Sequence, residues 1–323
     1  LTDDGKTAYT LIVNNISEHP EKIEIPQIDE DEFGKVFYAV TYDNPGILCF
    51  GMSSSVKADG NKFFYVPEYS ANKEECDKKT NELNTAVSEF LKTVPENSSD
   101  YEKELLTHDY ICDKCIYVYN EGESLKGAII NGEAVCEGYA RAAKLFLDKL
   151  SVINYLICGD ATNSDGKTES HMWNIVNIDG KNYHLDLTWD DYDNDSAAVS
   201  HSYFNLSDDM IKANHFNLAP SDNNCVSTDA NYFKVNNLMF ESFTKNEKKA
   251  MTSTAVKNVR NSCNQVEVCF VNAYAFNKAI TDLADKSGIY DVLDDVNKQC
   301  GKKFSSVTYA EDDDIYTVQL VFE

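Results

Sequence analysis

The sequence predicts an α+β protein, in which helices and antiparallel strands follow one another along a chain of 323 residues. Apolar residues recur at helical spacing over residues 72–92 and 137–150, which indicates two amphipathic helices. Asp179–Gly180 stands between two runs of alternating character, and this two-residue turn signal indicates an antiparallel hairpin. Because 42% of the residues are hydrophobic, the chain can form two or three structural units with real cores.

The chain is strongly acidic, with 54 Asp and Glu against 29 Lys and Arg and a net charge of -25. A field of this sign repels nucleic acid and anionic membrane surfaces, so we expect no nucleic-acid partner. No run of about 18 apolar residues occurs, and we therefore predict no transmembrane segment.

Ten cysteines are scattered too widely for a small disulfide scaffold. Cys112 and Cys115 form a C-x-x-C motif, but no second motif of paired cysteines or histidines accompanies it. We therefore interpret them as two thiols on a helix rather than as a zinc or redox site. The chain begins Leu1–Thr2 without methionine, which favours a trimmed precursor and an extracellular or cell-surface location, although a chosen boundary would look the same.

The first expected region, residues 1–95, mixes strands and a helix. Runs of β-branched and aromatic residues predict three strands, at residues 8–13, 36–40 and 62–66. The helix over residues 72–92 follows, because Cys76, Leu83, Val87 and Leu91 recur on one face. Pro95–Ser99 then has the composition of a linker and a helix cap.

The second expected region, residues 96–220, carries the candidate chemistry. We expect helices over residues 101–119 and 137–150, and three strands at residues 154–158, 171–178 and 181–188. The third region, residues 221–323, is expected to be a smaller α+β unit with a helix near residues 273–284 and a last strand at residues 315–322. It gives no functional signal.

Cys136 is the candidate nucleophile because it opens the helix over residues 137–150. N–H groups in the first turn of a helix are unpaired and the helix dipole is positive there, so both favour a thiolate. The same groups can bind the oxyanion that forms when a thiolate attacks a carbonyl. A single cysteine is also often a small buried apolar residue, and position alone leaves the two interpretations open.

The predicted hairpin brings a histidine and an aspartate together. With Asp179–Gly180 as a type I′ turn, Ile178 faces Lys181 across the two strands. The same register, carried to the end of both strands, makes His171 and Asp186 diagonal neighbours on one face. Such neighbours lie roughly 7–8 Å apart, which is within reach of their side chains.

The two faces of this hairpin differ in character. One is apolar apart from Asn174, and it consists of Met172, Val176, Ile178, Tyr183, Leu185 and Leu187. The other consists of His171, Trp173, Ile175, His184, Asp186 and Thr188. We therefore predict that the second face contains a site in which His171 accepts the proton of Cys136 and Asp186 orients the histidine ring.

Three blocks of this sequence resemble those of bacterial transglutaminase-like proteins. They are Asn-Gly-Glu-Ala-Val-Cys-Glu-Gly-Tyr-Ala at residues 131–140, His-Met-Trp-Asn at residues 171–174, and Tyr-His-Leu-Asp-Leu-Thr-Trp-Asp-Asp at residues 183–191. The preceding His108–Ile111 is similar to a block that stands before them. The resemblance covers residues 108–191, and three blocks in order are more specific than any one motif.

The resemblance implies a papain-like fold, with the nucleophile helix packed against an antiparallel sheet. It also implies a catalytic triad of Cys136, His171 and Asp186, a thioester intermediate formed from a protein or peptide amide, and no metal or organic cofactor. Family members include cross-linking transglutaminases, proteases, peptide N-glycanases and catalytically inactive binding modules, and the fold does not choose among them. We favour hydrolysis, with cross-linking and a non-catalytic cell-surface module as the alternatives.

Three further residues are candidates for binding substrate: Trp173, His184 and Asn131. His184 could equally be a buried, hydrogen-bonded structural histidine, and Trp189 is expected to pack rather than to line the site. A metal site built from Cys136, His171, His184 and Asp186 is the less favoured alternative. Zinc sites usually draw a closely spaced pair of ligands from one element, and here only His184 and Asp186 could form that pair. A catalytic triad accounts for the same residues.

Overall fold

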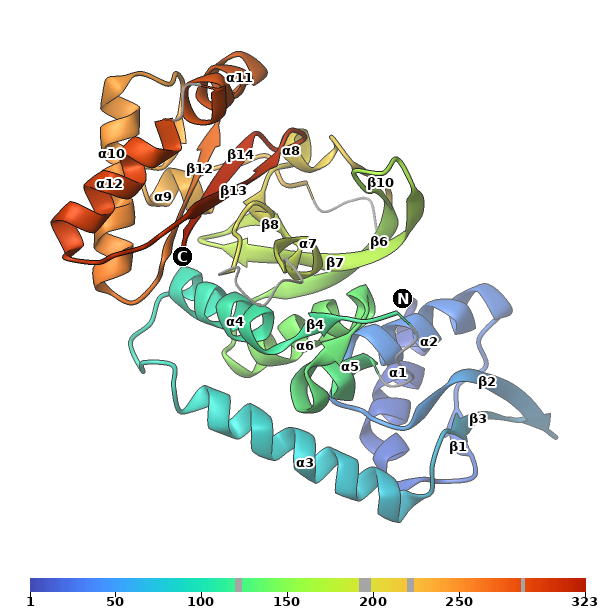
Figure 1. Ribbon diagram of the computed structural model, residues 1–323. Helices are drawn as coiled ribbons and strands as arrows, with labels where there is room; N and C mark the ends of the chain where they lie inside the picture. The colour runs from blue at the N-terminus through green and yellow to red at the C-terminus, as the bar shows by residue number, and fades with distance from the viewer. Residues whose placement is uncertain (120–123, 192–198, 220–223, 286–287) are drawn as a thin grey trace.

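The computed structural model describes residues 1–119, 124–191, 199–219, 224–285 and 288–323 and has an α+β fold (Figure 1), which confirms the predicted class. A central five-stranded sheet lies between a smaller N-terminal sheet and a smaller C-terminal sheet. Among the described residues, no helix combines the length and the apolar character needed to cross a membrane.

The N-terminal region combines two helices with a three-stranded antiparallel sheet of order β1-β3-β2. The helices are α1 (Asp3–Asn15) and α2 (Glu30–Asp43), and the strands are β1 (Ile23–Ile25), β2 (Phe50–Asp59) and β3 (Lys62–Tyr69). The strand predicted at residues 62–66 is confirmed as the first part of β3.

The strands predicted at residues 8–13 and 36–40 are wrong, because these residues lie in α1 and α2. Their β-branched and aromatic side chains favour strands locally, but burial selects the helix. In α1, for example, Ala8 and Ile12 are one helical turn apart and both fully buried. The side chain of Thr2 caps the same helix by accepting the N–H of Gly5.

A disulfide joins Cys49 to Cys76, at a sequence separation of 27 residues, and ties α3 (Lys73–Leu91) to the N-terminal sheet.

Replacing both cysteines by alanine is expected to lower the free energy of unfolding by about 3 to 4 kcal/mol, because the unfolded chain then gains the entropy of an open loop. Urea unfolding with and without reductant measures the effect. The double variant should not respond to reductant, and a wild-type protein equally unresponsive would contradict the prediction.

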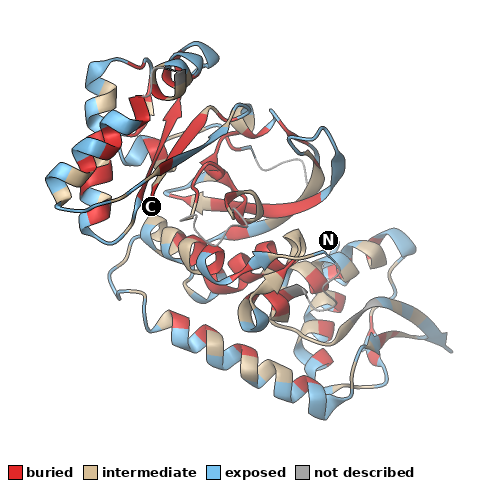
Figure 2. Cartoon of the chain, in the orientation of Figure 1, coloured by how far each residue is buried: buried red, intermediate tan, exposed pale blue. Residues whose placement is uncertain are grey.

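The central sheet is antiparallel, and its order is β10-β6-β7-β8-β9. Its strands are β6 (Asn154–Thr162), β7 (Thr168–Ile178), β8 (Lys181–Leu185), β9 (Phe204–Leu206) and β10 (His215–Ala219). α6 (Cys136–Lys149) packs on one face of the sheet, and α4 (Asp100–Lys114) lies beside it. α3 lies on the far side of these two helices from the sheet, and its Leu83 and Val87 enter the same core. Figure 2 shows burial along most of β7, whereas β10 at the edge of the sheet is mostly exposed.

The apolar face predicted for the hairpin packs on α6. Val176 of β7 and Tyr183 of β8 share one cluster with Tyr139, Ala143 and Phe146 of α6, and all five are buried. The opposite face is covered as well. A second apolar cluster lies there, with Ile157, Trp173, Ile175, Tyr203, Leu206, Ile211, Cys225 and Ile315 as its buried members. The hairpin therefore lies in the middle of a layered structure.

The helix predicted over residues 101–119 is correct as far as Lys114 and wrong beyond it. Cys115 adopts an extended conformation, and β4 (Ile116–Tyr117) then pairs in parallel with β5 (Glu133–Ala134). Between them, α5 (Ser124–Lys126) continues into a π-helical turn, Gly127–Asn131. The chain therefore returns to the end of α4 immediately before Cys136.

The C-terminal unit has a four-stranded sheet of order β11-β12-β14-β13 and its own apolar core. The strands are β11 (Met239–Phe240), β12 (Gln265–Phe270), β13 (Val307–Asp312) and β14 (Thr317–Phe322). The helices α10 (Lys245–Arg260), α11 (Ala273–Ile280) and α12 (Gly288–Cys300) pack on this sheet. The predicted last strand is confirmed from residue 317, and the helix predicted at residues 273–284 is α11 with a π-helical continuation, Thr281–Asp285.

Candidate active site

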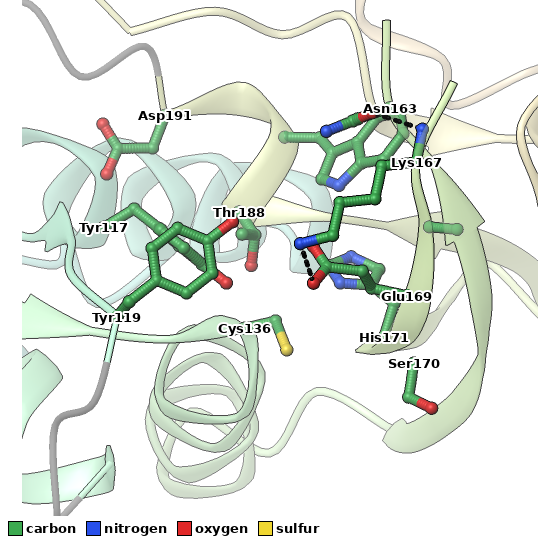
Figure 3. Close-up of a pocket in the computed structure, with 12 residues that line it drawn as sticks. Tyr117, Tyr119, Cys136, Asn163, Lys167, Glu169, Ser170, His171, Thr188 and Asp191 are labelled. Carbon is green, nitrogen blue, oxygen red and sulfur yellow. Dashed lines mark hydrogen bonds and ion pairs between the residues drawn. The ribbon is translucent and has the colours of Figure 1, made fainter. Parts of the chain in front are cut away.

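Cys136 is the first residue of α6, and its partly exposed thiol points into a pocket (Figure 3). The N-cap residue, Val135, forms no side-chain cap, whereas Ser99 forms a complete capping box with Glu102 at the start of α4. The N–H of Gly138 donates to the carbonyl of Val135 at 2.8 Å, so in the first turn the N–H groups of Cys136 and Glu137 are the ones that have no intrahelical acceptor. The start of α6 therefore offers these donors to negative charge that develops beside Cys136.

Gly132 lets the chain approach this point closely. Its φ is 73°, and a Cβ at this position would lie 2.6 Å from the carbonyl oxygen of Lys114. Any other residue would push β5 away from β4, because backbone atoms cannot yield as a flexible side chain can. The glycine thereby fixes where Cys136 stands relative to Tyr117 and the pocket.

The hairpin that carries His171 has the predicted turn and register. Asp179 and Gly180 both have positive φ, 53° and 76°, as a type I′ turn requires. Ile178 faces Lys181, and the pairing continues without a shift to Asn174 and Leu185.

The strand predicted over residues 181–188 ends at Leu185. The pairs that the predicted register would add beyond it, Trp173 with Asp186 and His171 with Thr188, therefore do not form. Asp186 instead caps a short helix, α7 (Leu187–Asp190), and its Oδ1 accepts the N–H of Thr188 at 3.0 Å. The cap competes with the ladder and ends the strand.

His171 and Asp186 are nevertheless in direct contact. The Nε2–H of His171 donates to Oδ2 of Asp186 at 2.7 Å, and both residues are buried. For Asp186, burial is the largest effect and raises the pKa, but the neighbouring histidines outweigh it and hold the pKa of this carboxyl below its usual range. The carboxylate form is therefore the one that faces His171.

Cys136 completes the contact on the other side of His171. Burial, the largest effect on the ring, lowers the pKa of His171, but the Asp186 carboxylate and the Cys136 sulfur together raise it to about 10. Since Nε2 is bonded to Asp186, Nδ1 is the ring atom left for the thiol. The three groups can thus form a thiolate and an imidazolium that a buried carboxylate holds in place.

Aromatic rings hold the plane of His171. Trp173 stacks on it with ring centroids 5.6 Å apart and an interplanar angle of 21°, and Trp189 lies at 6.0 Å. The indole N–H of Trp173 donates to Nδ1 of His184 at 3.1 Å, and His184 Nε2–H donates to Asp208 at 2.9 Å. Trp173 and His184, both predicted to bind substrate, are thus buried beneath His171.

The Trp173→Phe substitution is expected to lower the free energy of unfolding by about 1 to 3 kcal/mol beyond the loss of apolar contact, because it leaves Nδ1 of His184 buried without a donor. Trp189→Phe is the matched control, since Trp189 is only partly buried. Urea unfolding of the two variants measures the difference. Equal losses would show that the indole hydrogen bond contributes nothing.

The structure adds one histidine that the sequence analysis missed. His215, at the start of β10, is fully buried, and its Nε2 lies 3.1 Å from Oδ2 of Asp186, the same oxygen that accepts His171. The His171 and His215 rings stand 5.4 Å apart and nearly edge to face. Its local sequence carries no motif, because only the pairing of β10 with β6 brings it here.

Two recesses meet at Cys136 and His171. The first, of about 280 Å³, has Tyr117, Tyr119 and Trp189 on its wall, and the ion pair of Lys167 with Glu169 stands at 2.6 Å on its edge (Figure 3). The second, of about 400 Å³, is lined by polar and small groups, namely Glu137, Cys158, Gly159, Asp160, Ser170 and Asn217. A substrate can therefore extend on both sides of the thiol.

Other residues singled out in the sequence lie away from the thiol or support it indirectly. Asn131 is exposed and belongs to neither set of lining residues. Trp189, expected only to pack, lines the first recess. His108 is buried between Asp109 and Asp190 at 3.0 and 3.1 Å, and Tyr139 donates to Asp191.

Potential metal ligands cluster in three places among the described residues. They are His171 with Asp186 and His215, His184 with Asp208 and Cys225, and His108 with Asp109 and His201. In each cluster a histidine is already hydrogen-bonded to a carboxylate. His184 and Asp186 belong to different clusters, so the four-ligand metal site considered above does not assemble.

Comparison with known proteins gives a distant structural likeness. No protein-family model matches the chain, and no match was found among curated proteins. A TGase of known structure is similar over 55% of this chain and 53% of its own, with 14% identity and a TM-score of 0.31. A candidate cysteine protease from Cytophaga hutchinsonii is similar over 43% and 62% (11% identity, TM-score 0.26), and a candidate protease from Parabacteroides distasonis over 42% and 30% (9% identity, TM-score 0.26). The aligned part spans less than two thirds of each of these chains.

Proposed function

We propose that this protein is a cysteine-nucleophile acyl-transfer enzyme that acts on peptide-like amides through a thioester, with Cys136, His171 and Asp186 as its catalytic triad. The observation that carries the proposal is the arrangement of the triad. A partly exposed thiol at a helix start stands beside a histidine whose other nitrogen is bonded, at 2.7 Å, to a buried carboxylate. Neither an apolar core nor a structural cysteine requires that combination.

In the first step the Cys136 thiolate attacks the carbonyl carbon of the amide. The oxyanion that forms is stabilised by N–H groups in the first turn of α6. The C–N bond then breaks, the imidazolium of His171 gives its proton to the leaving amine, and a thioester remains on Cys136. Asp186 keeps the ring oriented and compensates its charge throughout.

In the second step a nucleophile attacks the thioester and His171 takes its proton. The C–S bond then breaks, which releases the acyl product and returns the thiolate of Cys136. Water gives hydrolysis, and a primary amine gives a new amide and hence cross-linking. We favour hydrolysis, because the recess beside Cys136, with Asp160, Ser170 and Asn217 among its lining residues, is open to solvent, so water can reach the thioester. The Cys49–Cys76 disulfide supports an exported protein, since disulfides persist in oxidising compartments.

The chain provides an internal control for the nucleophile. Cys158 lines the same recess as Cys136, but burial raises the pKa of its thiol. Iodoacetamide at pH 6 should therefore alkylate Cys136 at least about tenfold faster than Cys158, since only a thiolate reacts. Equal rates, measured by peptide mass spectrometry, would contradict an activated Cys136.

The reaction itself is tested with peptide substrates. We expect release of an amine from a peptide library without incorporation of a labelled primary amine into a glutamine peptide, and the Cys136→Ser variant should be inactive in both assays. Incorporation without hydrolysis would establish cross-linking instead. Silence in both assays from a protein with a reactive Cys136 would favour a non-catalytic binding module.

A further inference from the structure

We propose that the C-terminal unit (β11 to β14, residues 239–322) is part of the catalytic apparatus, because the turn between β13 and β14 positions Asp186 through Tyr203, Asn214 and His215. The inference rests on the proposed function and adds positioning residues to it. These residues touch neither the thiol nor a substrate. They determine where the carboxylate that orients His171 stands.

The inner link is the contact of His215 with Asp186. Oδ2 of Asp186 lies between two histidine nitrogens, at 2.7 Å from His171 and 3.1 Å from His215, while Oδ1 accepts the N–H of Thr188 at 3.0 Å. Three of the roughly four acceptor directions of the carboxylate are thus used by fixed partners. Without His215, the carboxylate keeps only one partner on Oδ2 and can turn away from His171.

The outer link runs from His215 to the C-terminal unit. Oδ1 of Asn214 lies 2.6 Å from Nδ1 of His215, and Nδ2 of Asn214 donates to the hydroxyl of Tyr203 at 2.7 Å and to Asp314 at 3.1 Å. The Tyr203 hydroxyl in turn donates to Oδ2 of Asp312 at 2.9 Å. A continuous chain of polar contacts therefore joins the catalytic aspartate to the β13–β14 turn.

The turn is rigid enough to act as an anchor. Oδ1 of Asp312 accepts the N–H groups of Asp314 and Ile315 at 2.9 and 3.1 Å, which closes the turn on itself. Ile315 is buried in the same apolar cluster as Trp173 and Tyr203. The turn therefore belongs to the apolar cluster that also contains Trp173, the ring that stacks on His171.

Separate contacts hold the C-terminal unit on the central region. Glu267 of β12 accepts the hydroxyl of Ser200 at 2.7 Å and the N–H of His201 at 2.9 Å, and Gln265 donates to the carbonyl of Val199 at 2.8 Å. Substitutions in the polar chain therefore leave the unit docked. This makes a positioning role separable from a purely structural one.

The test compares alkylation of Cys136 with that of Cys158, from pH 5 to 9, in the full chain. His215→Phe removes the partner of Asp186 and is expected to lower the Cys136 to Cys158 rate ratio at pH 6 about tenfold, the equivalent of one hydrogen bond to a charged group. His215→Gln should recover much of the ratio, because its amide can still donate to Asp186. Tyr203→Phe and Asp314→Ala should each lower the ratio severalfold.

The control is Gln265→Ala, which removes an interface hydrogen bond outside the chain and should leave the ratio unchanged while lowering the melting temperature. Asp314 lies on the exposed turn, so its variant remains informative if Tyr203→Phe does not fold. Unchanged ratios in folded His215→Phe and Asp314→Ala would overturn the inference. A wild-type protein with no preference for Cys136 would instead refute the proposed function itself.

Discussion

Substitution of Asp186 by asparagine is expected to lower the rate of amide turnover by about 10⁴-fold while the protein remains folded. The asparagine oxygen can still accept the N–H of Thr188, which places the amide nitrogen toward His171 and His215. His171 Nε2 must then carry a lone pair, so its proton moves to Nδ1. A ring that presents N–H to Cys136 cannot accept the thiol proton.

The matched control for this variant is Asp109→Asn. Asp109 also binds two histidines, His108 at 3.0 Å and His201 at 2.9 Å, but it does not line either recess at the thiol. Turnover of the most rapidly cleaved peptide and thermal unfolding are measured for both variants. If Asp109→Asn lost as much activity as Asp186→Asn, the loss would come from disturbing buried carboxylate–histidine contacts in general, and a specific role of Asp186 would be contradicted.

Replacing His171 by alanine is expected to abolish the preferential alkylation of Cys136. In the wild-type protein the raised pKa of His171 keeps the ring protonated up to about pH 10, so the imidazolium stays beside the sulfur across the neutral range. The alkylation rate of Cys136 should therefore change little between pH 6 and 9. In His171→Ala, the rate should rise about tenfold per pH unit below the ordinary pKa of a thiol, about 8.5.

The shape of the pH profile of alkylation distinguishes two possible causes of the reactivity of Cys136. If the start of α6 alone activated Cys136, the His171→Ala variant would keep a flat profile. If His171 supplies the charge, the profile becomes that of an ordinary thiol, and Cys300, another partly exposed free cysteine, provides the reference in the same sample.

The local parts of the site could be predicted because they depend on neighbours in sequence. Asp179–Gly180 fixes the register of β7 and β8 by its positive φ angles, and the structure has that register as far as Leu185. The start of a helix at Cys136 is likewise local. The β-branched and aromatic residues at 8–13 and 36–40 predict strands, but both runs are helical. Their buried residues recur at helical spacing, and this spacing decides the structure.

By itself, therefore, the sequence determined the α+β class, the hairpin turn and the proximity of His171 to Asp186, and it predicted Cys136 at the start of a helix. Only the tertiary structure decided what surrounds them. His215 reaches Asp186 because β10 pairs with β6, and the β13–β14 turn reaches Asn214 and Tyr203 because the C-terminal unit docks on the central sheet. Contacts between segments so far apart in the chain depend on burial and shape rather than on a local pattern, and no short motif specifies them.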